Sequence, residues 1–392
     1  MENRIRLFYA AGPGDVIGTY RFWKQKQEDP SLLGIADSAQ FYDIVVDKKA
    51  EALVIASCPR VDEIEDGAFH IKHLPKKSGT GILYHFNLIL YGLRICYEAI
   101  RFQADVAIIE EGTSHWFIWG ILHLFNIKII PSLKCVLWPQ FEPISQKQKI
   151  LNFMNRSFFR RKVQSIVSMS PDIDKEINWL TSNLHPPIFH FLPVYKKDVF
   201  DAIPPPDYSK KPFVVLFIGR IETYKGVFDL LTVAKHLKQH RDLHFYFCGT
   251  GTQLTQLKEQ IAAENLSETC DVFGHCDRTK LQEILSQSHV VVAPTRTSFS
   301  EGFCMVISEG ILAGRPVVTS KVCPGMSTVI PAVCEAIPND PLSYERAVLK
   351  LYEDPAFYRE KQQACVPLKS QFYDMKKSWK NAIASALEFM KK

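Results

Sequence analysis

The chain has 392 residues, of which 46% are hydrophobic and 23% are charged. Both fractions are typical of globular proteins and the length suits two domains, so extensive disorder is excluded. The 47 Lys and Arg against 42 Asp and Glu give a net charge of +5, which is too small an excess to indicate nucleic-acid binding. It favours phosphate groups or an anionic membrane surface as partners.

The cysteines and the apolar stretches predict a cytoplasmic protein. The ten cysteines lack the regular spacings of a disulfide framework, so we expect reduced, mostly buried thiols. The run CDVFGHCD at 270–277 lacks the second ligand pair of a zinc site, and no metal is expected there. No signal peptide is predicted. Residues 81–100 and 116–130 are interrupted by polar residues, which predicts buried or half-buried helices and no membrane span.

The first half of the chain alternates predicted strands and helices. Helices are predicted from about residue 17, over 81–102, in the later part of 105–122, over 146–163 and from 170. Strands are predicted over 4–9, 41–46, 52–57, 69–73, the start of 105–122, 127–133, 165–170 and 188–193.

Two loops in this half carry candidate binding residues. Gly12 and Gly14 form a glycine-rich turn that lets the backbone approach a phosphate or a sugar, and a simple turn explains them equally well. Glu110, Glu111 and His115 follow a predicted strand, at the edge where α/β sheets bind ligands. The alternative role for His115 is to cap or line the next helix.

Residues 147–162 predict a basic amphipathic helix, with Ile150, Met154 and Phe158 on one side. Such a helix can lie on an anionic membrane, which would place the protein on the inner face of the membrane. The alternative is a docked helix with a solvated basic face. Further on, Asp172 and Asp174 suit the first turn of a helix better than a metal site.

Residues 201–212 are proline-dense and predict a linker between two domains. After the linker, predicted strands and helices alternate regularly, which indicates a doubly wound parallel sheet. The predicted strands are 213–218, 243–248, 271–273, 290–293 and 316–319, and the helices are 226–239, 253–264, 279–287 and 303–313. We predict an α/β protein of two Rossmann-like domains that face each other across a cleft: 1–200 and 213–371, with a C-terminal helix in 372–392 that crosses back to the first domain.

The strongest functional pattern lies in residues 295–320. A helix predicted to open at Gly302 carries Glu301 at its start and Glu309 two turns on, roughly 12 Å apart. The two carboxylates can accept hydrogen bonds from sugar hydroxyls, although such a pair can also merely solvate a helix face. The first backbone amides of the helix suit a diphosphate, and they belong to Phe303, Cys304 and Met305. Sugar, diphosphate and ribose in a row indicate a nucleotide sugar.

A second pattern precedes it by about 80 residues. A predicted strand ends at Gly219 and Arg220, and Lys225 opens the next helix. Two cations beside a helix N-terminus make a phosphate site, unless they are only surface charges.

Together these patterns resemble those of retaining glycosyltransferases of the GT-B fold, the large family of bacterial glycogen synthases, sucrose synthases and lipid mannosyltransferases. The family has Gly-Arg, four residues and Lys-Gly, followed later by Glu, seven residues and Glu, with Gly-Phe after the first Glu. The likeness is specific over about 213–320. Cys304 departs from it, because the family usually has a small residue or proline there.

The resemblance implies a role for each donor-side residue. Arg220 and Lys225 would hold the diphosphate and stabilise the leaving charge without a metal, Glu301 would position the sugar, and Glu309 would bind the ribose. Gly249 and His275 would lie beside the nucleotide, and Trp379 would belong to the crossing helix.

The acceptor side is less complete. The resemblance assigns it to the first domain, with Gly12, Gly14, Glu111 and His115 as candidates. The histidine that family members carry there is missing, because the two corresponding places hold Glu110-Glu111 and Lys134-Cys135.

We therefore predict a retaining glycosyltransferase that moves a hexose from a nucleotide diphosphate sugar to a glycan or lipid-linked acceptor, with no cofactor and no nucleic-acid partner. Two alternatives stay open. One is a nucleotide-sugar epimerase of the same architecture, and the other is an inactive partner subunit that only binds the donor.

Overall fold

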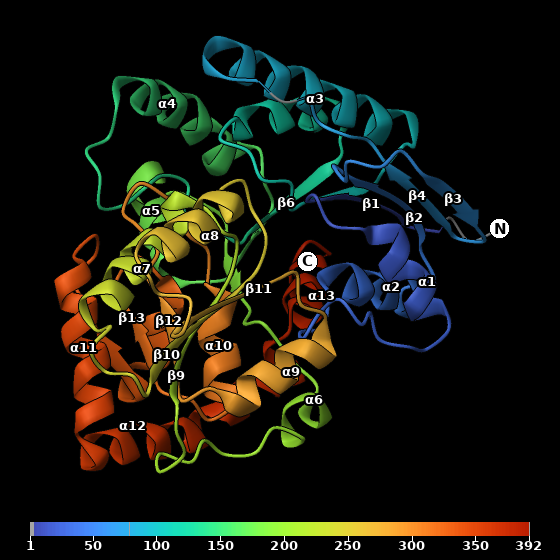
Figure 1. Ribbon diagram of the computed structural model, residues 1–392. Helices are drawn as coiled ribbons and strands as arrows, with labels where there is room; N and C mark the ends of the chain where they lie inside the picture. The colour runs from blue at the N-terminus through green and yellow to red at the C-terminus, as the bar shows by residue number, and fades with distance from the viewer. Residues whose placement is uncertain (1–3, 78, 392) are drawn as a thin grey trace.

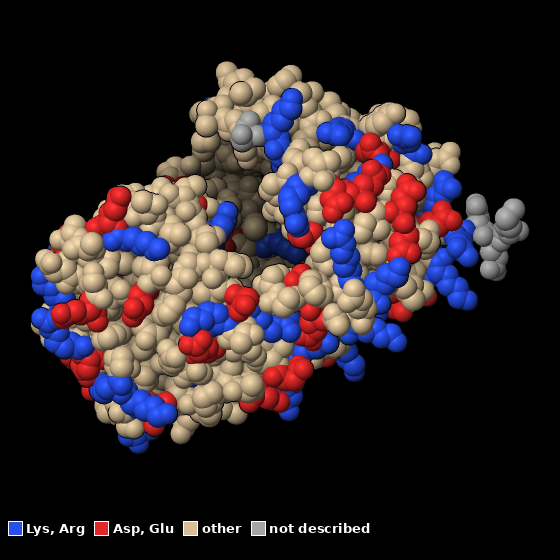
Figure 2. Space-filling view, turned by 45° about the vertical axis from the view of Figure 1, so that its right-hand side comes forward, with Lys and Arg blue, Asp and Glu red and all other residues tan. Residues whose placement is uncertain are grey.

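The computed structural model describes residues 4–77 and 79–391. It contains two α/β halves, each built on its own sheet, and the predicted arrangement of two Rossmann-like domains is confirmed (Figure 1). A hollow separates the two lobes (Figure 2).

The N-terminal sheet has the strand order β3-β4-β2-β1-β5-β6-β7-β8. Its pairs are parallel except β3 with β4. The strands are β1 Arg6–Ala11, β2 Glu51–Ala56, β3 Glu63–Asp66, β4 Phe69–His73, β5 Val106–Ile109, β6 Lys128–Leu133, β7 Ile166–Ser168 and β8 Ile188–His190. The helices are α1 Val16–Lys24, α2 Asp37–Asp47, α3 Gly81–Arg101, the 3-10 helix η1 Trp116–Phe125, α4 Gln146–Arg161, α5 Pro171–Thr181 and α6 Lys197–Asp201.

The C-terminal sheet is parallel throughout, in the order β11-β10-β9-β12-β13-β14. Its strands are β9 Phe213–Ile218, β10 Leu243–Cys248, β11 Cys270–Gly274, β12 Val290–Ala293, β13 Val317–Thr319 and β14 Val333–Glu335. The α-helices are α7 Val227–His236, α8 Leu254–Ala263, α9 Arg278–Gln287, α10 Met305–Leu312, α11 Pro341–Glu353, α12 Pro355–Leu368 and α13 Trp379–Phe389. The 3-10 helices are η2 Thr223–Lys225, η3 Pro324–Thr328, η4 Ile330–Ala332, η5 Lys369–Phe372 and η6 Met375–Lys377.

One predicted strand is wrong. Residues 41–46 lie in helix α2, although aromatic and β-branched residues fill this stretch. Phe41, Tyr42, Ile44 and Val45 are all buried, so packing against the sheet overrides the local β preference. The short edge strand β3 was not predicted, because its sequence EIED has little apolar character.

Helices α3 and α4 carry apolar side chains on their outer sides. Helix α3 is half-buried, and among the exposed side chains are Ile82 and Phe86, whose exposed fractions are 86% and 54%. On α4, Ile150 and Phe153 are exposed, but Phe158 is buried in the core and does not share the exposed face predicted for it. No helix among the described residues is both long and apolar enough to span a membrane.

The chain crosses between the lobes twice. It passes to the second sheet through residues 191–212 and returns through η5 and η6. The two crossings pair with each other: the Leu192 amide donates to the Lys377 carbonyl at 2.8 Å, and the Tyr195 amide donates to the Phe372 carbonyl at 2.9 Å.

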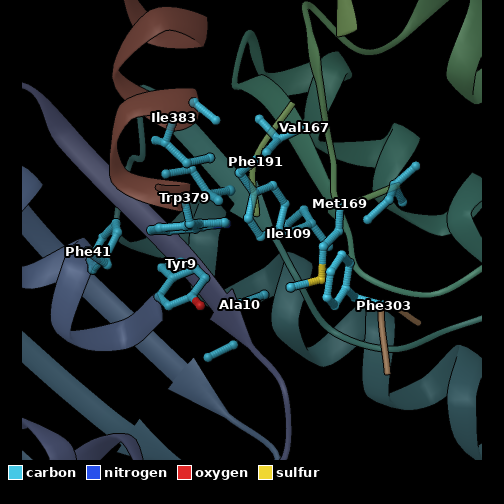
Figure 3. Close-up of a cluster of buried hydrophobic side chains, with 14 of the residues drawn as sticks. Tyr9, Ala10, Phe41, Ile109, Val167, Met169, Phe191, Phe303, Trp379 and Ile383 are labelled. Atoms are coloured by element: carbon cyan, nitrogen blue, oxygen red, sulfur yellow. The ribbon is translucent and has the colours of Figure 1, made fainter. Parts of the chain in front are cut away.

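Helix α13 completes the core of the N-terminal lobe. The Trp379 side chain is fully buried, its ring centroid lies 5.5 Å from that of Tyr9, and its Nε1–H donates to the Ser132 hydroxyl at 2.8 Å. Figure 3 shows the indole between Tyr9, Phe41 and Ile383, with Phe303 of the other lobe in the same apolar cluster. One continuous core therefore joins the lobes.

Candidate functional site

A cavity of about 560 Å³ lies between the lobes, at the carboxyl ends of β9 and β12. Parallel α/β sheets bind their ligands at this edge. Most of the predicted donor-side residues line the cavity: Gly219, Arg220, Lys225, Glu301, Gly302, Phe303, Cys304, Met305 and Glu309.

The two predicted phosphate-binding cations stand on an aromatic pair. Tyr224 and Phe299 stack with ring centroids 4.6 Å apart, and the Arg220 guanidinium lies 5.3 Å and 5.5 Å from the two centroids. The Lys225 ammonium lies 4.6 Å from the centre of Phe299. The rings hold both cations in place at the cavity. The aromatic pair was not predicted from the sequence.

Gly226 determines where the chain turns from Lys225 into α7. Its φ is 74°, and a Cβ atom at this position would lie 1.9 Å from the Pro294 carbonyl oxygen. Only glycine fits such a left-handed turn against another backbone. The turn therefore fixes Lys225 beside the loop that follows β12.

The Glu301 side chain is buried, and both of its carboxylate oxygens accept hydrogen bonds. Its Oε2 accepts hydrogen bonds from the Lys225 ammonium at 2.5 Å and from the Thr295 hydroxyl at 2.9 Å, and its Oε1 accepts from the Gly302 amide at 3.0 Å. Burial works against a charged lysine, but the carboxylate outweighs it and raises the pKa of Lys225. Glu301 and Lys225, predicted for different parts of one ligand, thus form an ion pair.

The helix that follows begins later than predicted. Helix α10 starts at Met305 rather than Gly302, and Cys304 occupies the N-cap position with φ of 64°. Glu301 therefore precedes the helix and does not share a helical side with Glu309. The reason is the first lobe: Gly302 pairs with Cys135, and the Val136 amide donates to the Glu301 carbonyl at 3.1 Å. No side chain caps the start of α10, which leaves its first amides open toward a ligand.

Glu309 lies one turn into α10 and lines the cavity. Burial among apolar neighbours raises its pKa to about 7. The preceding residue, Ser308, shares a hydrogen bond of 2.8 Å with the Tyr195 hydroxyl, which ties this helix to a crossing segment. A carboxylate held in this way can accept hydrogen bonds from a diol.

Gly249 and His275 lie outside the cavity lining. Gly249 has φ of 139°, and a Cβ there would lie 1.8 Å from the Gly219 carbonyl oxygen, so this glycine lets the loop pack on the end of β9. The His275 side chain is exposed just beyond β11.

The residues predicted for the acceptor side are also outside the cavity. Gly12 and Gly14 lie in the loop between β1 and α1. Glu111 and His115 line a separate, very small cavity, where Lys76 pairs with Glu111 and His85 lies 3.2 Å from His115. Burial raises the pKa of Glu111 and lowers the pKa of His115. Their assignment to an acceptor stays a prediction.

Another set of side chains faces the cavity from the first lobe. The Lys134 ammonium pairs with Asp37 at 2.5 Å and with Glu110 at 2.6 Å, and Lys134 and Asp37 line the cavity. Burial raises the pKa of Glu110 to about 7 against the opposing effect of Lys134. Lys134 directly follows β6, so its place at a strand end could have identified it as a candidate site residue. No local feature of the sequence identified Asp37 as one.

The structure also shows the surroundings of the two sequence clusters that were weighed as metal sites, Asp172 with Asp174 and the run at 270–277. Asp172 and Asp174 lie in the first turn of α5, as predicted, and bind Lys175 at 2.7 Å and His190 at 2.6 Å. At 270–277, Cys276 lies beside Cys248, a strand residue of the neighbouring β10, rather than beside a second ligand pair.

Part of the chain is similar to known proteins. Residues 201–367 match the family described as glycosyl transferases group 1. The glycogen synthase of Mycobacterium tuberculosis is 27% identical over 215 residues, which are 53% of this chain and 50% of that protein. The chain thus spans about half the length of this curated relative.

Two solved structures share the fold over almost the whole chain. Sucrose-phosphate synthase from Thermosynechococcus elongatus superimposes with a TM-score of 0.69 and 15% identity, covering 99% of this chain and 98% of that one. HepE from Anabaena, solved in complex with UDP, superimposes with a TM-score of 0.65 and 15% sequence identity. The match covers 99% of this chain and 98% of that one.

Proposed function

We propose that this chain, which has the GT-B fold and whose residues 201–367 match the group 1 glycosyl transferases, transfers a hexose from a nucleotide diphosphate sugar to a glycan or glycolipid acceptor, with retention of configuration and without a metal. One observation carries this proposal. Arg220, Lys225, Glu301 and Glu309 surround a single cavity at the uncapped start of α10. The cavity offers cations, open amides and carboxylates in the combination that a sugar diphosphate needs.

The donor would exchange contacts that the site already holds. Its diphosphate would bind Arg220 and draw the Lys225 ammonium away from Glu301. The released Glu301 oxygen could then accept a hydrogen bond from the sugar, while Glu309 accepts from the ribose. As the glycosidic bond breaks, the two cations would stabilise the charge on the leaving diphosphate. The leaving phosphate would take the proton of the acceptor hydroxyl, so no protein base is required.

A thermal-shift panel of UDP-, GDP- and ADP-sugars with EDTA present tests this function. We expect one donor to raise the melting temperature of the wild type but not of Glu309→Ala. Glu283→Ala, at an exposed carboxylate of the same lobe, is the matched control and should respond like the wild type. The absence of any shift would contradict the donor site. Products then separate the alternatives: an acceptor-linked sugar supports transfer, a free epimer indicates an epimerase, and neither indicates a partner subunit.

We also propose that the acceptor is approached at the inner face of an anionic membrane. The support comes from α3 and α4: Ile82 and Phe86 are exposed on α3, and on α4 the exposed Phe153 lies between the exposed basic residues Lys149 and Arg156 in the sequence. Apolar anchors beside cations are the combination that holds a protein on anionic lipid.

Sedimentation with vesicles tests the membrane proposal. We expect binding to vesicles that contain phosphatidylglycerol and much weaker binding to pure phosphatidylcholine. Phe86→Glu should abolish binding, and Val61→Glu, at an apolar side chain that is 83% exposed elsewhere on the lobe, should not. Equal binding of both variants would contradict this orientation.

A further inference from the structure

A compact group of soft and acidic ligands lies beside the proposed donor site. Glu301, Cys304 and Cys323 each offer one ligand atom, and these three atoms lie within 4.8 Å of one another. They come from the loop before α10, the N-cap of α10 and the segment between β13 and η3. The two thiols are also hydrogen-bonded to each other, which raises the pKa of Cys304 and lowers that of Cys323.

The spacing suits tetrahedral coordination. Bonds of about 2.3 Å from zinc to sulfur place two ligands of a tetrahedron about 3.8 Å apart. The observed limit of 4.8 Å therefore requires only small side-chain movements to bring all three atoms onto one ion. Two thiolates and a carboxylate are a ligand set that prefers Zn²⁺ over Mg²⁺ or Ca²⁺.

The group is buried and still reachable from the cavity. Cys323 is completely buried and Glu301 is 5% exposed, so an ion bound there would be shielded from water. Cys304 is partly exposed and lines the cavity, which provides the route for the ion. Three protein ligands leave a fourth position open.

We propose that Glu301, Cys304 and Cys323 form an inhibitory Zn²⁺ site whose open position faces the donor cavity. Binding of the ion requires only these residues, whereas the inhibition rests on the proposed donor function. The ion would replace Lys225 at the Glu301 carboxylate and occupy the region that the donor diphosphate needs. Zinc and nucleotide sugar would then compete, and the two thiols would release their protons to water and become thiolates as the ion binds.

Removal of the thiols one at a time tests the site directly. Cys304→Gly deletes a thiol without strain, because glycine adopts the φ of 64° freely. Cys323→Ala deletes the buried thiol, and Cys334→Ala, at a half-buried cysteine of the same lobe, is the matched control. Zn²⁺ affinity is measured by competition with a chromogenic chelator in the presence of a phosphine reductant. Loss of an outer-shell partner costs about 10–100-fold in metal affinity, so loss of a ligand should cost about 100-fold or more.

Co²⁺ as a probe counts the thiolates independently of enzyme activity. Two other clusters among the described residues could also take an ion, Asp15-Cys58-His73 and Glu63-Glu65-His70, but they offer one thiol at most. A thiolate-to-cobalt band that halves in each single variant and persists in Cys334→Ala supports the site. A band that is absent from the wild type, or unchanged in Cys304→Gly and Cys323→Ala, overturns it.

Donor binding is measured on the same protein with and without Zn²⁺. A donor shift that zinc abolishes in the wild type, but not in Cys323→Ala, supports inhibition. Tight zinc binding with no donor shift in either state would refute the proposed donor function and leave the metal site standing. A donor shift that survives saturation with zinc would refute the inhibition.

Discussion

The two walls of the cleft hold their polar side chains in different ways. The C-terminal wall, residues 219–225 and 295–309, presents cations and carboxylates around one cavity, and its Arg220 is exposed. The N-terminal wall, residues 34–37 and 134–135, presents an ion pair of Lys134 and Asp37, as the C-terminal wall does with Lys225 and Glu301, but its other candidates Glu111 and His115 lie in a separate cavity. The difference indicates that one wall is prepared for a charged ligand and the other is mainly supporting structure.

The largest effect should follow from Arg220→Ala. We expect turnover of the donor to fall about 10²–10³-fold, because a preorganised donor of hydrogen bonds to the developing charge is lost. The fold should be unaffected, since Arg220 is exposed and its guanidinium lies over the faces of two rings. Release of nucleoside diphosphate from the active donor is the measurement. Arg241→Ala, at an exposed arginine that pairs with Glu268, should keep full turnover. Full turnover of Arg220→Ala would contradict the assigned role of the C-terminal wall.

Gly302→Ala tests the contact between the walls. The new Cβ would lie 2.5 Å from the Lys134 carbonyl oxygen, so the backbones must move apart. We expect a loss of about 1–3 kcal/mol in the free energy of unfolding, as for other overpacked sites, measured by urea denaturation. Gly112→Ala has open space around its new Cβ and serves as the control. If both variants are equally stable, the walls do not touch as described.

Glu309→Gln should raise the melting temperature at pH 8 but lower the affinity for the donor. The pKa of Glu309 is about 7 in the fold against 4.5 for an ordinary glutamate, so its effect on stability is most favourable below pH 4.5 and is lost as the pH rises toward 7. At pH 8 the variant should therefore melt higher than the wild type, and at pH 4.5 the two should coincide. Donor affinity should nevertheless fall about tenfold, because a charged acceptor of hydrogen bonds is lost. Melting curves and calorimetric titration over this pH range measure both. A variant less stable than the wild type at pH 8 would refute the raised pKa of this half-buried carboxylate.

The smallest effect on donor binding should come from His115→Ala. His115 lies with His85 and Ser114 outside the donor cavity, so donor affinity should not change, although the melting temperature should decrease. Calorimetric titration with the donor is the measurement. A clear loss of donor affinity would mean that the N-terminal wall takes part in donor binding.

Much of the C-terminal wall could be predicted because its chemistry is local. Gly219, Arg220 and Lys225 lie at one strand-to-helix junction, although Phe299, which packs against both cations, comes from a distant loop. Glu301 lines the same cavity, but it precedes the helix instead of lying on it, because its loop is held by Cys135 and Val136 from the other lobe. Contacts of this kind leave no trace in a local pattern.

The N-terminal wall shows the opposite case. Asp37 and Lys134 are almost a hundred residues apart in the sequence and meet only because β6 and α2 approach in the fold. Long-range packing also explains the misassigned strand at 41–46. Its β-favouring residues form a helix because their side chains are buried in the core. Long-range packing decided both.

The place of Trp379 in the first lobe has a consequence for how the protein is made. A ribosome produces the strands of the N-terminal sheet long before it reaches this tryptophan. Until then, Tyr9 and Ser132 lack the indole that covers them, and the hydrogen bonds between the two crossing segments cannot form. The nascent first lobe therefore carries an open apolar site through translation of the entire second lobe. The indole that closes this site is added only after the whole second sheet has been translated.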